Sequence, residues 1–190
     1  NGELLLNNGL PQATGDSENL GECSPNFNMG FNLSASYKKL TLSATLDWQN
    51  GGKMYNGTLL TMNYFGATNE SLPYHEGTMV AEGIDQATGL KNTVQVSKQK
   101  YYQAYTNVTE AGIYDTGYLK LRDVTLSYKL PKFAGVDLSV YAFARNLLLW
   151  AKMPTFDPES SQGNGNMGGY FERFSVPNTS SFGGGFKLSF

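Results

Sequence analysis

Apolar and polar residues alternate in two neighbouring segments, 26–37 and 40–50. In both, every second residue is apolar, and the residues between them are mostly small and polar. A period of two predicts β-strands whose faces differ in character. A two-residue turn between the segments places Tyr37 opposite Leu40, and it pairs apolar with apolar residues along the rest of the hairpin. Each strand is about 11 residues long, which is enough for a tilted strand to cross a lipid bilayer.

The same alternation predicts three further strands nearer the C-terminus, over residues 117–130, 136–149 and 180–190. In the first of them the apolar positions change parity part-way along the strand. This change predicts a β-bulge near Arg122 and Asp123, because one extra residue moves the following side chains to the opposite face.

The connections between these strands differ in length. Two are short, at residues 38–39 and 131–135, whereas residues 51–116 and 150–179 form long Gly- and Asn-rich segments. Residues 1–25 are also polar and read as a loop. Short turns at one end and long loops at the other are typical of outer-membrane β-barrels, in which the long loops are extracellular.

The two faces of the predicted strands differ in composition, as expected for a sheet with one face in contact with lipid. The apolar face carries no charged residue, and the other face is mostly Ser, Thr, Gly and Asn. Aromatic residues lie at both ends of the apolar face: Phe27 and Trp48 at the long-loop end, and Tyr37, Tyr128 and Phe190 at the short-turn end. Such belts are expected at the two membrane interfaces. The predicted fold class is therefore all-β, a transmembrane antiparallel β-barrel, although a soluble ligand-binding barrel or sandwich would also alternate.

Five strands cannot close such a barrel, whose strand number is even and at least eight. An open sheet in lipid would leave unpaired backbone groups at its edges. The sequence, which begins at Asn1 without Met or a signal peptide, is therefore expected to be a processed or partial chain.

The composition argues against several other classes of protein. The 190 residues carry a net charge of −2, which offers no electrostatic basis for nucleic-acid binding. Apolar residues make up 40% but form no run long enough for a transmembrane helix. The single cysteine, Cys23, cannot form an internal disulfide and is expected in a loop.

The sequence contains no strong motif for a catalytic, metal or cofactor site. Gly163, Gly165 and Gly168 match a dinucleotide-binding spacing but lack the strand before and the helix after that such a site needs. His75 is the only histidine and is expected to be an exposed loop residue. We therefore expect no catalytic, metal or cofactor site, and no enzyme.

Charged residues suggest structural roles. Asp157 and Glu159 could form a hydrolase pair or a calcium site, but without a third ligand we interpret them as a loop anchor, with Asp157-Pro158 beginning a turn. Arg122 and Asp123 are expected to pair with each other in the wall, or else to line the lumen.

Several blocks, in the order expected, resemble the SusC/RagA family of TonB-dependent outer-membrane transporters. They cover most of the chain and lie at Pro25 to Asn56, Tyr118 to Pro131, Arg145 to Leu147, Asp157 to Glu159 and Gly184 to Phe190. The departures are minor, such as Asp123 at a position where Glu is usual.

The resemblance implies that residues 1–190 are the C-terminal part of such a barrel, holding the last five of about 22 strands. It implies active import of a glycan or peptide nutrient across the bacterial outer membrane. The implied partners are a SusD-like surface lipoprotein, outer-membrane lipid, and TonB, which would act through an N-terminal part outside this sequence. Phe190 would belong to the signal that the assembly machinery recognises.

Three residues on the lumen-facing side of one strand are candidates for substrate contact: Tyr141, Phe143 and Arg145. Aromatic faces stack on sugars, and Arg binds polar groups. Packing of these side chains against a plug domain is the alternative. For the whole protein, the alternative is a passive porin or structural barrel without energy coupling.

Overall fold

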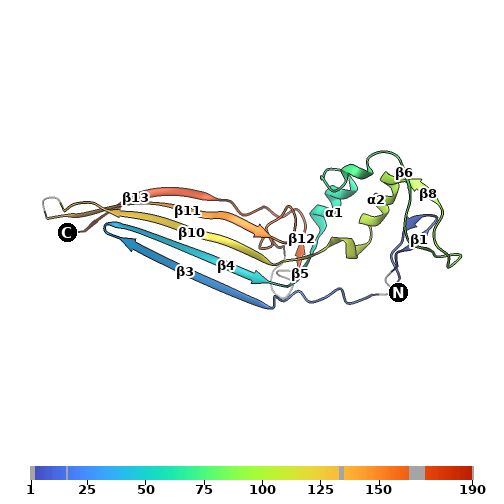
Figure 1. The fold of residues 1–190 in the computed structure, drawn as a ribbon, viewed down its shortest axis with the longest axis horizontal. Coiled ribbons are helices and arrows are strands. Elements are labelled where there is room, and N and C mark those ends of the chain that lie inside the picture. The colour runs from blue at the N-terminus through green and yellow to red at the C-terminus, as the bar shows by residue number, and fades with distance from the viewer. Residues whose placement is uncertain (1–2, 16, 133–134, 163–169, 190) are drawn as a thin grey trace. The chain divides into compact units, whose positions relative to one another are not determined.

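The computed structural model describes residues 3–15, 17–132, 135–162 and 170–189 (Figure 1). The chain divides into two compact units. The first, here called the sheet unit, comprises residues 23–52, 115–160 and 176–190, and the second, the loop unit, comprises residues 1–22, 53–114 and 161–175. None of the described helices has the length and apolar character needed to cross a membrane.

The sheet unit is built on five antiparallel strands, which lie side by side in Figure 1 in the order β13-β11-β10-β4-β3. Their bounds are β3 (Phe27–Tyr37), β4 (Leu40–Asn50), β10 (Tyr118–Lys129), β11 (Asp137–Ala151) and β13 (Ser181–Ser189). The alternation of apolar and polar residues along all five explains why they pair as extended strands with two unlike faces.

The β3–β4 hairpin has the predicted register. Tyr37 pairs with Leu40 across the Lys38-Lys39 turn, and Phe31 pairs with Leu46 further along. Lys38 adopts a positive φ of 55°. A tight two-residue hairpin turn requires such a conformation because it must follow the right-handed twist of the strands.

The predicted bulge is present in β10. Between Leu121 and Asp123, β10 advances two residues while β4 advances only from Leu46 to Thr45. On the other side β11 has an irregularity at the same level, where Asn146 has a φ of +49°. Asn tolerates this left-handed conformation better than most residues, which explains its place at the irregularity.

Both long connections leave the sheet from the same end. Tyr118, the first residue of β10, pairs with Gln49 near the end of β4 and with Ala151 at the end of β11. The connections that follow β4 and β11 therefore begin beside each other, as the topology inferred from the sequence requires.

The loop unit contains more regular structure than the sequence pattern predicted. Residues 1–25 were expected to be a loop, but they include β1 (Leu5–Asn7) and β2 (Leu10–Pro11), which pair with each other. The remaining elements are short: β5 (Lys53–Asn56), α1 (Gly57–Tyr64), the 3-10 helix η1 (Leu72–Tyr74), β6 (Thr78–Val80), β7 (Ile84–Asp85), β8 (Gln95–Ser97), α2 (Lys98–Thr106), the 3-10 helix η2 (Thr109–Gly112), β9 (Ile113–Asp115) and β12 (Phe171–Glu172). They form a three-stranded sheet β2-β1-β7, a three-stranded sheet β12-β5-β9 and the pair β6-β8.

The loop unit is held together by buried polar contacts as well as by an apolar core. The Asn56 side chain caps α1 by accepting a hydrogen bond from the Leu59 backbone N–H at 2.8 Å. Glu172, which is fully buried, accepts hydrogen bonds from Thr58 at 2.8 Å and from the Ser175 backbone N–H at 3.0 Å. Because Thr58 and Glu172 are far apart in sequence, their contact helps to give the loop unit a defined structure.

Several residues discussed above lie outside the described part of the chain. These are Phe190, the glycines Gly163, Gly165 and Gly168, and part of the 131–135 connection.

Candidate functional site: the two faces of the sheet and an ion cluster

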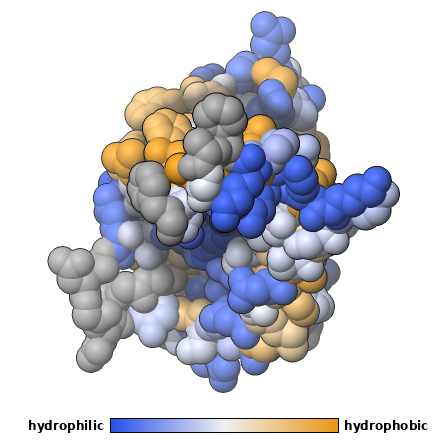
Figure 2. Space-filling view, turned by 90° about the vertical axis from the view of Figure 1, so that its left-hand side faces the viewer, coloured by the Kyte–Doolittle hydropathy of each residue, from blue (hydrophilic) through white to orange (hydrophobic). Residues whose placement is uncertain are grey.

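The apolar residues of all five strands meet in continuous rows on one face of the sheet. Near the short connections the row contains Tyr37, Leu40, Tyr128, Val140 and Phe186, and near the other end it contains Trp48, Leu119 and Trp150. These side chains are largely exposed, Phe186 at 70% and Trp150 at 55%. Figure 2, a view onto the end that holds the short connections, shows hydrophobic patches beside projecting hydrophilic groups. An apolar surface of this extent indicates contact with something other than water.

The height of this band suits a lipid bilayer. A strand rises about 3.3 Å per residue, so the rows that contain Leu119 and Tyr128 lie roughly 30 Å apart along β10, or roughly 23 Å at a tilt of about 40°. This is close to the apolar height of about 25 Å in outer-membrane barrels. Aromatic rings lie at both limits, and at one of them Phe27 packs edge-on against Trp48 with ring centroids 4.9 Å apart.

Two of the predicted substrate-contact residues, Tyr141 and Phe143, lie on the opposite, polar face. They pair with Gly185 and Gly183 of β13. A Cβ atom placed on Gly185 would lie 2.7 Å from the Tyr141 hydroxyl, and one on Gly183 would lie 2.6 Å from the Phe143 ring. The two rings therefore cover the backbone of β13 at positions where only glycine leaves room. This contact gives Tyr141 and Phe143 a packing role within the sheet.

Arg145, the third candidate, is more open. Its guanidinium lies 5.0 Å from the centre of the Phe143 ring, and its Nε lies 3.5 Å from the Asp123 carboxylate. The Arg145 side chain is 64% exposed. It is therefore the candidate with the most surface available to a ligand.

A buried ion cluster occupies the long-loop end of the polar face, and Lys120 is at its centre. Lys120 is 2% exposed, and its Nζ donates hydrogen bonds of 2.7 Å to both Asp157 and Glu159. Asp157 is 8% exposed and also accepts a hydrogen bond of 2.9 Å from Asn178. A lysine so deeply buried is tolerated because its charge is paired twice.

Arg122 extends the cluster across the wall. Its Nε donates to Asp47 on β4 at 2.5 Å, and its two terminal nitrogens donate to the two carboxylate oxygens of Glu159. The Tyr118 hydroxyl donates to the same carboxylate at 3.0 Å. We name these six residues the wall–loop cluster: Asp47, Tyr118, Lys120, Arg122, Asp157 and Glu159. Since bidentate Arg–carboxylate pairing fixes orientation as well as distance, the cluster holds the loop against two strands.

The cluster confirms the loop-anchor interpretation of Asp157 and Glu159. The Ser160 backbone N–H donates to the Asp157 carbonyl at 2.9 Å, which closes the expected turn. Burial alone would raise the pKa of the Asp157 carboxyl, but hydrogen bonds from Lys120 and Asn178 hold this pKa below its ordinary value. Burial acts in the same sense on Glu159, and hydrogen bonds from Arg122 and Lys120 likewise keep its pKa low.

The expected ion pair between Arg122 and Asp123 is wrong. Arg122 pairs with Asp47 and Glu159, whereas Asp123 pairs with Arg145. The bulge explains this result, because it directs both residues to the polar face, where each finds a partner on a neighbouring segment. A signal for the cluster was present in the sequence, since Lys120 and Arg122 share one parity and therefore lie on one face of the strand.

A cavity of about 520 Å³ lies beside the cluster within the sheet unit. Its lining includes Lys120, Asn146, Leu149, Asp157 and Asn178. The cavity combines an ion pair, side-chain amides and apolar walls, and it opens beside the segment that the cluster anchors.

No family profile matches the chain, but two curated proteins do. TonB-dependent receptor P3 of Formosa agariphila is 26% identical over 190 residues, and TonB-dependent receptor P26 of the same organism is 28% identical over 188 residues. Each match takes in 94% of this chain. The chain is similar to TonB-dependent receptors. It spans 18% of the length of each of these two proteins.

Solved structures support the same fold. The RagAB peptide importer matches in its open-open state with a TM-score of 0.60, and in its closed-closed state with a TM-score of 0.59. Both matches are 24% identical and cover 88% of this chain, but only 17% and 18% of the solved chains. The chain therefore has the fold of a β-barrel portion, which confirms the predicted fold class. The total of about 22 strands stays a prediction.

Proposed function

We propose that this chain supplies part of the wall and the external rim of a TonB-dependent active transporter in a bacterial outer membrane. The observation that carries the proposal is the match to TonB-dependent receptors along 94% of the chain. The apolar face supports it, since rows of exposed apolar side chains between aromatic belts suit a barrel surface in lipid. Transport, and not catalysis, is the activity that this architecture supports.

The proposed cargo is a glycan or a peptide. Of the three candidates for contact with it, Arg145 has the most open side chain, and Tyr141 and Phe143 extend the same polar face. A SusD-like lipoprotein is the proposed partner, seated on the long connections at the end of the sheet where β4 and β11 end. We further propose that these connections are extracellular and that Phe190 belongs to the assembly signal.

The test is energy-dependent uptake by cells that produce the whole transporter. Labelled oligosaccharides and oligopeptides are offered to cells with and without functional TonB, and to cells that lack the lipoprotein. Uptake that requires both proteins supports the proposal. Uptake that continues unchanged without TonB would show a passive porin instead.

The substrate contacts are tested in the same assay. Arg145→Ala is expected to raise the substrate concentration for half-maximal uptake while leaving the amount of transporter unchanged. Lys129→Ala is the matched control, because Lys129 is also an exposed cation, at 60%, but lies near the other end of the sheet. Equal effects from the two variants would remove Arg145 from the site.

A further inference from the structure

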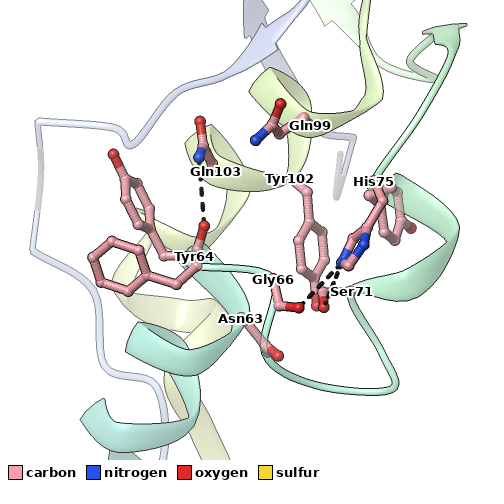
Figure 3. A pocket seen from close by; sticks show the side chains of 10 residues that line it. Asn63, Tyr64, Gly66, Ser71, His75, Gln99, Tyr102 and Gln103 are labelled. Carbon is pink, nitrogen blue, oxygen red and sulfur yellow. Dashed lines mark hydrogen bonds between the residues drawn. The ribbon is translucent and has the colours of Figure 1, made fainter.

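A second cavity, of about 210 Å³, lies wholly within the loop unit between the end of α1 and the start of α2 (Figure 3). Tyr64 lies on one side of it, and Tyr102 and His75 lie on the other. Two side-chain amides from α2, Gln99 and Gln103, border it as well. The cavity is smaller than the roughly 300–1,000 Å³ of pockets for drug-sized ligands. It therefore suits a single ring better than an extended chain.

The floor of the cavity is fixed by polar contacts within the loop unit. Ser71, which is 1% exposed, donates a hydrogen bond of 2.6 Å to the Thr68 carbonyl. His75 Nε2 lies 3.1 Å from the Gly66 carbonyl oxygen. Gly66 has a φ of +74°, and a Cβ there would lie 2.9 Å from His75 Nε2. Because only glycine fits this position easily, the wall between Gly66 and His75 is part of the folded structure and not a chance arrangement.

Two side-chain amides at the cavity have groups that are open to a ligand. Gln103 Nε2 makes a long hydrogen bond of 3.5 Å to the Tyr64 carbonyl, and its Oε1 has no partner among the described residues. The amide of Gln99 has none in the described chain either, and this side chain is exposed. Burial, followed by the nearby Glu70, raises the pKa of Tyr102 to about 12, so its hydroxyl stays protonated. The free amide of Gln99 can offer two donors and an acceptor, and Gln103 can offer its acceptor oxygen.

The charge of the lining restricts the ligand class. Among the described residues, no Asp, Glu, Lys or Arg lines the cavity. A charged ligand such as an acidic sugar or a peptide terminus would be desolvated there without an opposite charge. A neutral sugar ring avoids this cost, because its C–H face packs on an aromatic ring and its neighbouring hydroxyls pair with amides.

We propose that the cavity formed by Tyr64, Gln99, Gln103, Tyr102 and His75 binds one ring of a neutral oligosaccharide. This proposal rests on the proposed function, in which a transporter meets its nutrient through these connections. It identifies the nutrient as a glycan rather than a peptide. Binding at the cavity needs no energy coupling, however, so it can be measured apart from transport.

The experiment measures binding to the full-length transporter, purified in detergent, by titration calorimetry. The neutral probes are cellotriose, laminaritriose and mannotriose, with trigalacturonate and triglycine as the acidic and peptide comparisons. Gln103→Ala and Tyr64→Ala are expected to weaken binding of the preferred neutral trisaccharide about fivefold to tenfold, since each removes one hydrogen bond or one ring contact. Gln86→Ala, which removes an exposed amide away from the cavity, should change it less than twofold.

Gln99→Ala separates a loss of binding from a folding defect. Gln99 is exposed, so its replacement should leave the loop unit folded. It should weaken binding several-fold while the melting temperature stays unchanged. The proposal is overturned if none of the neutral probes binds, if trigalacturonate or triglycine binds more tightly, or if the three cavity variants behave like Gln86→Ala. TonB-independent uptake with intact saccharide binding would contradict only the transport proposal, and TonB-dependent uptake without saccharide binding would contradict only this one.

Discussion

Removing Lys120 is the most direct test of the wall–loop cluster. In Lys120→Met the methionine keeps much of the buried volume but cannot donate to Asp157 or Glu159, both of which lie 2.7 Å from Lys120 Nζ. Asp157, which is 8% exposed, would keep only its hydrogen bonds from Asn178 and from the Glu159 backbone. Breaking a buried pair in this way costs about 3–5 kcal/mol, because one charge stays buried without compensation.

The affected region is the anchored segment, residues 153–160, so the assay must report on that segment. Amide hydrogen exchange at Ser160 is suitable, since its N–H donates to the Asp157 carbonyl at 2.9 Å. A loss of about 3–5 kcal/mol from the opening free energy corresponds to exchange that is roughly 100-fold to several thousand-fold faster. Proteolytic nicking within residues 153–160 should increase in parallel.

Two controls make this prediction refutable. Lys129→Met removes a lysine that is 60% exposed and lies 3.7 Å from Asp137, so it should cost no more than about 1 kcal/mol. In the double variant Lys120→Met/Asp157→Leu the orphaned carboxylate is also removed, and much of the lost protection should return. If Lys120→Met and Lys129→Met accelerate exchange equally, or if the double variant is worse than the single one, the cluster does not anchor the segment.

Three other predictions concern the membrane face, the pH response and assembly. Leu42→Arg should destabilise the barrel by about 2–4 kcal/mol in equilibrium unfolding, because it places a charge among lipid-facing residues, and Ser43→Arg should cost far less; equal costs would mean that the faces are inverted. The pKa values of Asp157 and Glu159 are lowered in the folded chain, so their stabilisation is complete above the unfolded value of about 4 and is lost as the pH falls below it; nicking of the anchored segment should therefore rise below about pH 4, and a rate independent of pH would contradict this. Burial of a Phe side chain is worth roughly 1.5–3 kcal/mol at most, yet deletion of Phe190 should mainly reduce the amount of barrel assembled in the membrane; an unchanged amount with a lowered melting temperature would refute the signal role.

The sheet could be predicted from the sequence because residues close together in the chain determine its strands and turns. Alternation of apolar and polar residues defines each strand, and the two-residue turn at Lys38 fixes the register between β3 and β4. The bulge in β10 was also visible as a change of parity. These features depend on neighbours within one strand or one hairpin, so they can be read without knowing the fold.

The loop unit and the ion cluster could not be predicted in the same way. Helix α1 has only eight residues, too few to show a clear apolar period, and it is stabilised by Glu172, which lies far away in sequence. Arg122 likewise finds Glu159 only after β11 and its following loop have folded back. Since such pairs are set by tertiary structure, the local pattern suggested the nearer partner, Asp123, and that suggestion was wrong.

The bulge in β10 also has a consequence for how this wall can change over evolutionary time. A one-residue insertion in a regular strand exchanges its two faces and would turn charged residues towards lipid. Here the register already shifts between Leu121 and Asp123, next to the irregular position Asn146 of β11. The parts of the strands on either side of this level are therefore partly independent of each other. Insertions and deletions between related chains should concentrate at this level and beyond it towards the long connections, while the spacing from Val124 to Tyr128 stays constant.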